Sequence, residues 1–431
     1  MNKKLSGRFW CAVTLFSLIG QVAWVIENMY FNVFIYNMFK ATADDIALMV
    51  GASAVAATLT TVFMGALSDR IGKRKLFICG GYILWGISIL SFTLIRTDII
   101  GSIFPTVTAV TSLCITLVII LDCVMTFFGS TANDAAFNAW LTDSTDSSNR
   151  GAVEGINAMM PLVAILVVFG GFMFFDLTTA QNWTIIFAII GVVVTAIGVL
   201  GAFLIKDSKT EKPNYSYLGC IFYGFRPTTI KKNVSLYLTL IAFVVFNTSI
   251  QIFMPYLIIY YEQTLKMKDY VLIMAPAIVI AAVFTAFWGR VYDKKGFNFS
   301  VLVALASLCV GYVILFFTKT MLPVFIGSLF MMCGYLAGMA VFGAMIRDKT
   351  PENKAGMFQG LRIFAQVLIP GIIGPQIGAA VLTNADTITN SDGTTSFLPN
   401  EYIFLAALIT IVVLIPVLLI IKKKGAKVNE N

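Results

Sequence analysis

Apolar stretches about as long as a bilayer is thick recur along the whole chain, and short polar breaks separate them. A helix needs about 20 apolar residues to cross the hydrocarbon core of a membrane. The pattern therefore predicts an all-α membrane protein with twelve transmembrane helices. The predicted spans are residues 9–38, 46–67, 76–95, 113–141, 152–176, 183–205, 233–261, 270–292, 299–318, 321–346, 357–383 and 402–421.

The chain repeats a short loop pattern at the basic end of two of these spans. Gly65–Gly72 and Gly289–Gly296 share the spacing Gly-x-x-x-Asp-basic-x-Gly, and they lie 224 residues apart. A second repeat begins at Asp143 and Asp348, each followed by glycines eight and twelve positions later. Two repeats in the same order predict two pseudo-symmetric six-helix bundles. We expect the N-terminal bundle at 1–205, a cytoplasmic linker at 206–232, the C-terminal bundle at 233–421 and a cytoplasmic tail at 422–431.

The composition and the charge distribution agree with a multi-pass membrane protein. Hydrophobic residues make up 58% of the 431 residues, charged residues 12%, and the mean hydropathy is +0.87. Of the 30 Lys and Arg, the predicted topology places 24 on the side that holds both termini, five opposite and one inside the membrane. The positive-inside rule makes that basic side cytoplasmic, so we expect a protein of the plasma (inner) membrane. The net charge of +8 then has a topological cause, and we expect no nucleic-acid partner.

The histidine and cysteine content of the chain is unlike that of most enzymes and metal-binding proteins. It has no histidine, which removes the commonest general base, metal ligand and proton carrier near neutral pH. The seven cysteines are scattered without a CxxC pair, so we expect no disulfide framework and no zinc site. We therefore expect no enzyme, no metal and no cofactor, and any proton chemistry must use carboxylates.

The loop pattern makes the chain resemble a known family of transporters. Twelve helices in two halves, with Gly65–Lys75 between the second and third helices, resemble the major facilitator superfamily. Within it, the segment Asp134–Asp143 is similar to the glycoside-pentoside-hexuronide cation symporters, which include the melibiose permease. Sodium-coupled members carry two acidic residues where this chain has Ala57 and Thr61. We therefore expect the coupling ion to be a proton rather than sodium.

The resemblance implies that the two loop repeats form a gate. In the superfamily this turn latches the cytoplasmic side when the outer side is open. The alternative is that the turn only fixes the topology, although its recurrence in the second half favours the gate. The predicted gating residues are Gly65, Asp69, Arg70, Gly72, Arg74, Gly289, Asp293 and Gly296.

Ionisable residues inside the predicted spans are the best candidates for the transport site. An ionised group at the bilayer centre costs about 2.5 to 3.5 kcal/mol even on insertion scales. Four residues qualify, namely Glu27, Asp122, Asp134 and Arg362. Glu27 lies beside a polar stripe that suits a hydroxyl-rich ligand, although it could instead join the first helix to a neighbour. With the polar residues near them, the predicted substrate- and cation-binding residues are Glu27, Asn28, Asn32, Asp122, Asp134, Asn138, Gln251, Arg362 and Gln366.

On an ideal helix, Asp122 and Asp134 would face different directions, so we assign them different roles. Asp122 and Asp134 are twelve residues apart, which gives about 18 Å of rise and about 120° of rotation. We predict Asp134 as the carboxylate that binds the cation or proton, while Asp122 either takes part or faces an outer vestibule. A lone membrane arginine needs a counter-charge. We hypothesise an Asp134–Arg362 pair that the substrate or a proton breaks, with a permanent salt bridge at the inner gate as the alternative.

These features predict a secondary active transporter that works by alternating access. Its substrate would be a small polar solute, such as a sugar or glycoside, moved together with protons by a monomer in the lipid bilayer. An exporter of amphipathic compounds or a lipid transporter of the same fold is the alternative, and an apolar cavity open to lipid would favour it. A sensor derived from a transporter would bind the solute without flux.

Overall fold

The computed structural model describes residues 5–145, 149–207, 223–267, 269–350, 355–390 and 393–429. The chain forms two compact units, Met1–Tyr217 (unit 1) and Leu218–Asn431 (unit 2), and each is described by itself. Most of the predicted linker at 206–232 lies outside the described residues. The predicted domain boundaries therefore remain predictions.

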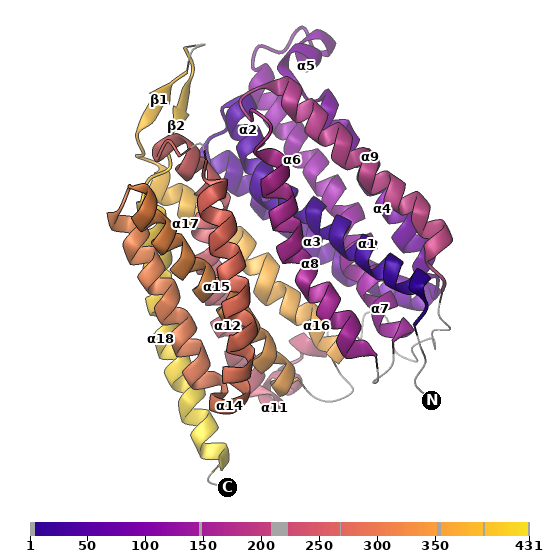
Figure 1. The fold of residues 1–431 in the computed structure, drawn as a ribbon, viewed down its shortest axis with the longest axis vertical. Helices are drawn as coiled ribbons and strands as arrows, with labels where there is room; N and C mark the ends of the chain where they lie inside the picture. Colours follow the sequence, from indigo (N-terminus) through magenta and orange to yellow (C-terminus); the bar gives the residue numbers. More distant parts are fainter. Residues whose placement is uncertain are drawn as a thin grey trace. The chain divides into compact units, whose positions relative to one another are not determined.

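Unit 1 consists of long helices that lie side by side (Figure 1). Two of its membrane helices are continuous rods that contain a short π-helical segment, where the backbone hydrogen bonds skip one further residue. Its elements are α1 (Gly7–Val25), η1 (Ile26–Tyr30), α2 (Phe31–Phe39), α3 (Ala43–Ile71), α4 (Arg74–Ser91), η2 (Phe92–Leu94), α5 (Thr97–Ile103), α6 (Val110–Gly129), η3 (Ser130–Phe137), α7 (Asn138–Ser144), α8 (Arg150–Phe172) and α9 (Ala180–Leu204).

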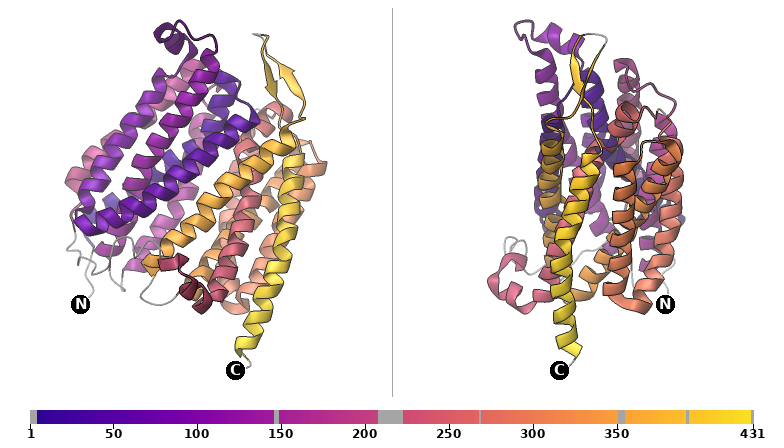
Figure 2. Two further views of the ribbon diagram at one scale, coloured as in Figure 1. Left: turned by 180° about the vertical axis from the view of Figure 1, so that it is seen from behind. Right: turned by 90° about the vertical axis from the view of Figure 1, so that its left-hand side faces the viewer.

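Unit 2 is built in the same way and adds a small β-hairpin. The hairpin projects beyond the ends of α17 and α18 (Figure 2), and its antiparallel strands pair Thr387 with Phe397. The elements are η4 (Tyr223–Phe225), α11 (Pro227–Lys232), α12 (Val234–Phe253), η5 (Met254–Tyr256), α13 (Leu257–Ile259), η6 (Tyr260–Thr264), α14 (Val271–Phe317), α15 (Met321–Lys349), α16 (Ala355–Ile363), η7 (Phe364–Leu368), α17 (Ile369–Leu382), β1 (Thr387–Thr389), β2 (Thr395–Phe397) and α18 (Tyr402–Asn429).

The predicted all-α fold with twelve crossings is confirmed. Within the described residues, eleven helical segments are long and apolar enough to span a membrane. One of them, α14, has 47 residues and contains Gly296 with a φ of 74°, so it is two helices joined at the repeated loop pattern. The strands β1 and β2 were not predicted, because a hairpin of two three-residue strands has no hydrophobic period that distinguishes it from a polar loop.

Glycines allow the helices of each unit to pack closely. In unit 1, a Cβ at Gly86 of α4 would lie 2.1 Å from Thr195 Oγ1 and 2.6 Å from the Gly191 carbonyl oxygen of α9. In unit 2, a Cβ at Gly334 of α15 would lie 2.4 Å from the Leu308 amide nitrogen of α14. Such contacts need a residue without a side chain, as at many helix interfaces in membranes.

Candidate functional site

A buried carboxyl group in the middle of the first membrane helix organises a polar cluster in unit 1. The Glu27 side chain is only 7% exposed, and its Oε1 accepts hydrogen bonds of 2.8 Å from Ser53 Oγ and from Thr126 Oγ1. The two hydroxyls are themselves 2.9 Å apart. The other carboxyl oxygen, Oε2, is buried without a described partner. The helices α3 and α6 thus hold one oxygen of Glu27 and leave the second unsatisfied.

Asp122 on α6 belongs to the same cluster. It is 2% exposed, and its Oδ1 has no described hydrogen-bond partner. Its electrostatic neighbours are Glu27 and the hydroxyl of Ser53. Thr126 follows Asp122 by four residues, so both side chains lie on one face of α6. We call Glu27, Ser53, Asp122 and Thr126 the carboxyl cluster.

Asp134 lies on the π-helical segment η3, and it is less buried than the other two carboxyls. Its Oδ2 accepts a hydrogen bond of 3.0 Å from Ser130 Oγ, and the indole of Trp24 lies beside it. The charge of Asp134 also acts on Glu27. This π-helical segment changes the rotation between Asp122 and Asp134 from that of an ideal helix. Both carboxyls interact with Glu27.

The three predicted asparagines bind backbone carbonyls next to the π-helical segments. Asn28 Nδ2 donates to the Trp24 carbonyl at 2.7 Å, and Asn32 Nδ2 donates to the Asn28 carbonyl at 3.2 Å. Asn138 Nδ2 donates to the Asp134 carbonyl at 3.1 Å and does not bond the carboxyl. Asn28 and Asn138 are exposed, whereas Asn32 is fully buried with an unpartnered Oδ1.

The structure adds three polar residues that were not predicted, namely Ser53, Thr126 and Asn133. Asn133 is 4% exposed, and its unpartnered Nδ2 lies where a Cβ of Gly20 would be only 2.4 Å away. Serine and threonine are common in membrane helices, so the sequence marks neither hydroxyl. The four-residue spacing from Asp122 to Thr126 is the one signal that could have found one of them.

In unit 2 the predicted arginine lies beside a second arginine. Arg362 is half-buried on α16, its Nη2 would be 3.6 Å from a Cβ at Gly343, and Arg347 is its electrostatic neighbour. No carboxylate in the described part of unit 2 forms a salt bridge with it. The hypothesised Asp134–Arg362 pair would join unit 1 to unit 2 and remains a prediction.

The predicted glutamines of unit 2 lie on two different helices. Gln251 on α12 is half-buried, and its Cβ would be 2.4 Å from a Cβ at Gly374. Gln366 is half-buried within η7. Each of the four π-helical segments among the described residues contains a polar or acidic residue, namely Glu27, Asp134, Glu262 or Gln366. Such segments often occur at functional sites.

The first loop repeat forms an ion-pair cluster around a buried arginine. Arg74 forms a salt bridge with Asp69, its Nε contacts Asp143 Oδ2 at 3.1 Å, and its Nη1 donates to Ser68 Oγ at 2.6 Å. Its side chain is 4% exposed. Gly72 ends α3 with a φ of 71°, a conformation that favours glycine. Gly65 makes only an ordinary contact, since its Cβ would lie 3.7 Å from Ala135 Cβ.

In the second loop repeat, the link between the loop and the acidic residue is made without an arginine. The residue 224 positions after Arg74 is Asn298, and the residue 224 positions after Ser68 is Tyr292. Tyr292 donates a hydrogen bond of 2.6 Å to Asp348 Oδ2, and Asp348 is the counterpart of Asp143 in the second repeat. Each unit therefore ties its loop to the acidic end of another helix by its own chemistry. Asp293 forms no described salt bridge, and Gly289 has open space around its Cβ position.

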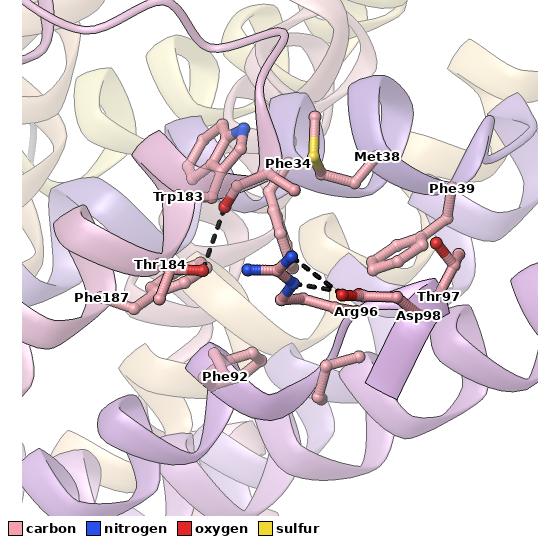
Figure 3. Close-up of a pocket in the computed structure, with 12 residues that line it drawn as sticks. Phe34, Met38, Phe39, Phe92, Arg96, Thr97, Asp98, Trp183, Thr184 and Phe187 are labelled. Carbon is pink, nitrogen blue, oxygen red and sulfur yellow. Dashed lines mark hydrogen bonds and ion pairs between the residues drawn. The ribbon is translucent and has the colours of Figure 1, made fainter. Parts of the chain in front are cut away.

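A small cavity lies at the other end of unit 1, near α5 (Figure 3). Its volume is about 40 Å³, and Phe34, Trp183, Arg96 and Asp98 are among the residues that line it. Arg96 Nη2 binds Asp98 Oδ2 at 2.9 Å, and this hydrogen-bonded pair holds the pKa of the Asp98 carboxyl below its usual value. None of the predicted site residues lines the cavity.

The sequence model of the Major Facilitator Superfamily matches residues 10–375. The chain belongs to the major facilitator superfamily. Membership indicates transport of small solutes across a membrane rather than catalysis. The glycoside-pentoside-hexuronide branch remains a prediction. No curated protein matches the chain.

Solved structures of this superfamily's fold cover nearly the whole chain. A bacterial homologue of the human lysosomal transporter Spinster, in an inward-facing and unoccupied conformation, has a TM-score of 0.72 at 13% identity and covers 98% of this chain and 99% of its own. A point mutant of the nucleoside transporter NupG has a TM-score of 0.72 at 12% identity and covers 95% and 99%. The xylose transporter XylE from E. coli has a TM-score of 0.67 at 13% identity and covers 96% and 99%. At these identities the likeness shows the fold alone.

Removing the buried arginine should destabilise this superfamily member measurably. Arg74→Met would leave Asp143 without its ion partner, and breaking a buried pair costs about 3–5 kcal/mol. Because Asp69 and Asp143 are 47% and 21% exposed, water recovers part of that cost, and we expect a loss of about 1–3 kcal/mol. Thermal unfolding of the purified protein in detergent measures it. Arg70→Met is the matched control, since Arg70 is exposed on the same loop, and equal losses in both variants would contradict the role of Arg74.

Proposed function

We propose that the protein is a secondary active transporter that moves a small polar solute, a sugar or glycoside, together with protons by alternating access. We place it as a monomer in the plasma (inner) membrane, with both termini in the cytoplasm. The observation that carries this proposal is the carboxyl cluster. Two acidic side chains lie within the membrane-spanning part of unit 1, and no described arginine or lysine forms a salt bridge with either. Buried acids of this kind usually serve ion or proton movement.

A polar solute fits the remaining candidate residues. Asn28, Asn32 and Asn138 of unit 1 and Gln251 and Gln366 of unit 2 offer hydrogen-bonding groups within apolar helices. Two solved structures of similar fold are named as transporters of xylose and of nucleosides, and both kinds of solute carry sugar hydroxyls. An exporter of amphipathic compounds would need an apolar site instead, so these amides favour a sugar-like solute.

Proton coupling follows from the cost of carrying charge through the membrane. An ionised carboxyl without a counter-charge is costly there, and adding a proton removes the charge. A carrier loaded with proton and solute then changes conformation more readily than a half-loaded one. Asp134 and Arg362 would form and break an ion pair during this cycle. Because Ala57 and Thr61 stand where sodium-coupled relatives of the resembled branch carry acids, we favour the proton over sodium.

The two loop repeats would act as the latches of the cytoplasmic gate. In unit 1 the latch is the cluster of Asp69, Arg74 and Asp143, and in unit 2 it is the Tyr292–Asp348 hydrogen bond. The first joins opposite charges, whereas the second joins a neutral hydroxyl to a carboxylate. We therefore expect the two latches to differ in their response to salt, which screens exposed charges.

The proposed function can be tested on the purified protein without knowing the solute beforehand. A thermal-shift screen of sugars, glycosides and nucleosides, run with and without sodium at two pH values, identifies a ligand. Counterflow of that ligand in proteoliposomes then separates a transporter from a sensor, because only a transporter exchanges labelled solute. Stabilisation by a hydroxylated solute together with counterflow is the expected result. Binding without counterflow would overturn the proposal in favour of a sensor, and stabilisation only by amphipathic compounds would favour the exporter.

A further inference from the structure

The carboxyl cluster contains two acids that share their neighbours. Glu27 is 7% exposed and Asp122 is 2% exposed, and each has one carboxyl oxygen that no described group hydrogen-bonds. The Ser53 hydroxyl is a neighbour of both acids, since it donates to Glu27 at 2.8 Å and interacts with Asp122. Three separate helical rods supply the cluster, with Glu27 on η1, Ser53 on α3 and both Asp122 and Thr126 on α6.

We propose that Glu27 and Asp122 act together as one proton-binding site, in which the Ser53 hydroxyl connects the two carboxyls. Two buried acids that interact strongly bind protons as a pair and not as individual residues. In this arrangement the unpartnered oxygens of Glu27 and Asp122 are the places where the proton is held. The inference rests on the proposed transport function and deepens it, because it assigns the coupling proton to this pair and not to Asp134.

The surroundings of the pair favour a proton. The ionisable neighbours are the Cys123 thiol on α6 and Asp134 on η3, while Tyr82 of α4 interacts with Asp134. No described lysine or arginine is among the interactions of either acid. No described group on these helices therefore neutralises the negative charge of the pair. A bound proton must remove that charge for the two acids to stay buried at a moderate free-energy cost.

The geometry favours a proton over a metal cation. The oxygen–oxygen distances from Glu27 to the two hydroxyls are both 2.8 Å, and the hydroxyls are 2.9 Å apart. These are ordinary O–H···O hydrogen-bond lengths, and the two hydroxyl hydrogens account for the two contacts with Glu27. Among the described residues there is also no group of three or more acidic, cysteine or histidine side chains that could hold a metal.

Asp134 differs from the pair in ways that suit another role. It is half-buried, its hydrogen bond comes from Ser130 on the same helix, and the neighbouring Asn138 is exposed. The more accessible face with Asp134 and Asn138 suits contact with the solute. The more deeply buried pair suits a proton, which needs no space.

Infrared spectroscopy of the protein at rest tests the pair directly. The C=O stretching band of protonated carboxyls is followed from pH 4 to 10 in purified wild type, Glu27→Gln, Asp122→Asn and the matched control Glu154→Gln, whose carboxyl is exposed on α8. We expect a band from buried protonated carboxyl in wild type. We expect each single substitution in the pair to displace the pH profile of the remaining carboxyl by one pH unit or more, since coupled sites interact by at least that much. Glu154→Gln should leave the profile unchanged.

Three results would overturn the proposal. One is the absence of a buried-carboxyl band at any pH, the second is an unchanged profile of the remaining acid in both single variants, and the third is loss of the band on adding sodium. Ser53→Ala is a second variant that keeps both acids, and it should move the band position because a donor to Glu27 is lost. The measurement needs no solute and no transport, so its failure is distinguishable from a failure of the proposed function, which is the absence of counterflow.

Discussion

Substituting Glu27 with glutamine is expected to abolish uphill uptake of the solute while counterflow continues. Glutamine keeps the shape of the side chain and can still accept hydrogen bonds from Ser53 and Thr126, but it cannot bind and release a proton. A proton that moves down a membrane potential of about 100 mV supplies about 2.3 kcal/mol, which supports roughly 40-fold accumulation of the solute. The variant should therefore fall from accumulation of that order to simple equilibration, measured as uptake of labelled solute into proteoliposomes with an imposed potential and pH gradient.

Counterflow provides the internal control for this variant, because exchange of solute for solute requires conformational change without net proton movement. Glu154→Gln is the matched control for loss of a carboxyl from a membrane helix, since that side chain is exposed. It should keep full accumulation. Undiminished uphill uptake by Glu27→Gln would show that the coupling proton binds elsewhere. Loss of counterflow along with uptake would place Glu27 in the solute site instead.

The second large effect concerns folding, and it is expected for leucine at Gly86. A Cβ at this position would lie 2.1 Å from Thr195 Oγ1, 2.5 Å from the Thr195 amide nitrogen and 2.6 Å from the Gly191 carbonyl oxygen. Two of these atoms belong to the backbone of α9, so no side-chain movement relieves the clash. Overpacking typically costs about 1–3 kcal/mol and more where backbone must move. We expect a loss of more than about 3 kcal/mol, which in a unit of this size lowers the unfolding midpoint by roughly 6–12 °C or more.

Gly80 on the same helix gives a matched control. A Cβ there would meet nothing within 4 Å, so Gly80→Leu adds the same side chain to α4 without a clash. Its midpoint should stay within a few degrees of wild type. Size-exclusion profiles and thermal unfolding in the same detergent compare the two variants. If both variants unfold alike, the close α4–α9 packing is not what holds unit 1 together.

The membrane helices were predictable because the thickness of the bilayer sets the length of each apolar stretch in the sequence. The predicted spans 46–67 and 183–205 correspond to α3 (Ala43–Ile71) and α9 (Ala180–Leu204), and the differences are a few residues at each end. The bend at Gly296 was marked by the same spacing that places Gly72 at the end of α3. A repeated loop motif therefore marks both turns in the sequence alone.

The carboxyl cluster was only half predictable, because burial of an acid is visible in sequence and its partners are not. Glu27 and Asp122 stood out as charges inside apolar runs, while Ser53 and Thr126 are ordinary residues in a membrane helix. Their contact with Glu27 depends on how three helices rotate against one another. The π-helical segment η3 changes that rotation between Asp122 and Asp134, and no pattern in the sequence predicted it.

Solute-driven proton movement in sodium-free proteoliposomes shows directly whether this transporter couples a solute to protons at buried carboxyls. Purified wild-type protein is reconstituted, a gradient of the solute identified by the screen is imposed, and a pH dye reports protons. We expect solute moving down its gradient to carry protons with it and to alkalinise the side it leaves, and we expect no signal from Glu27→Gln. Solute flux in wild type without any pH change would contradict proton coupling.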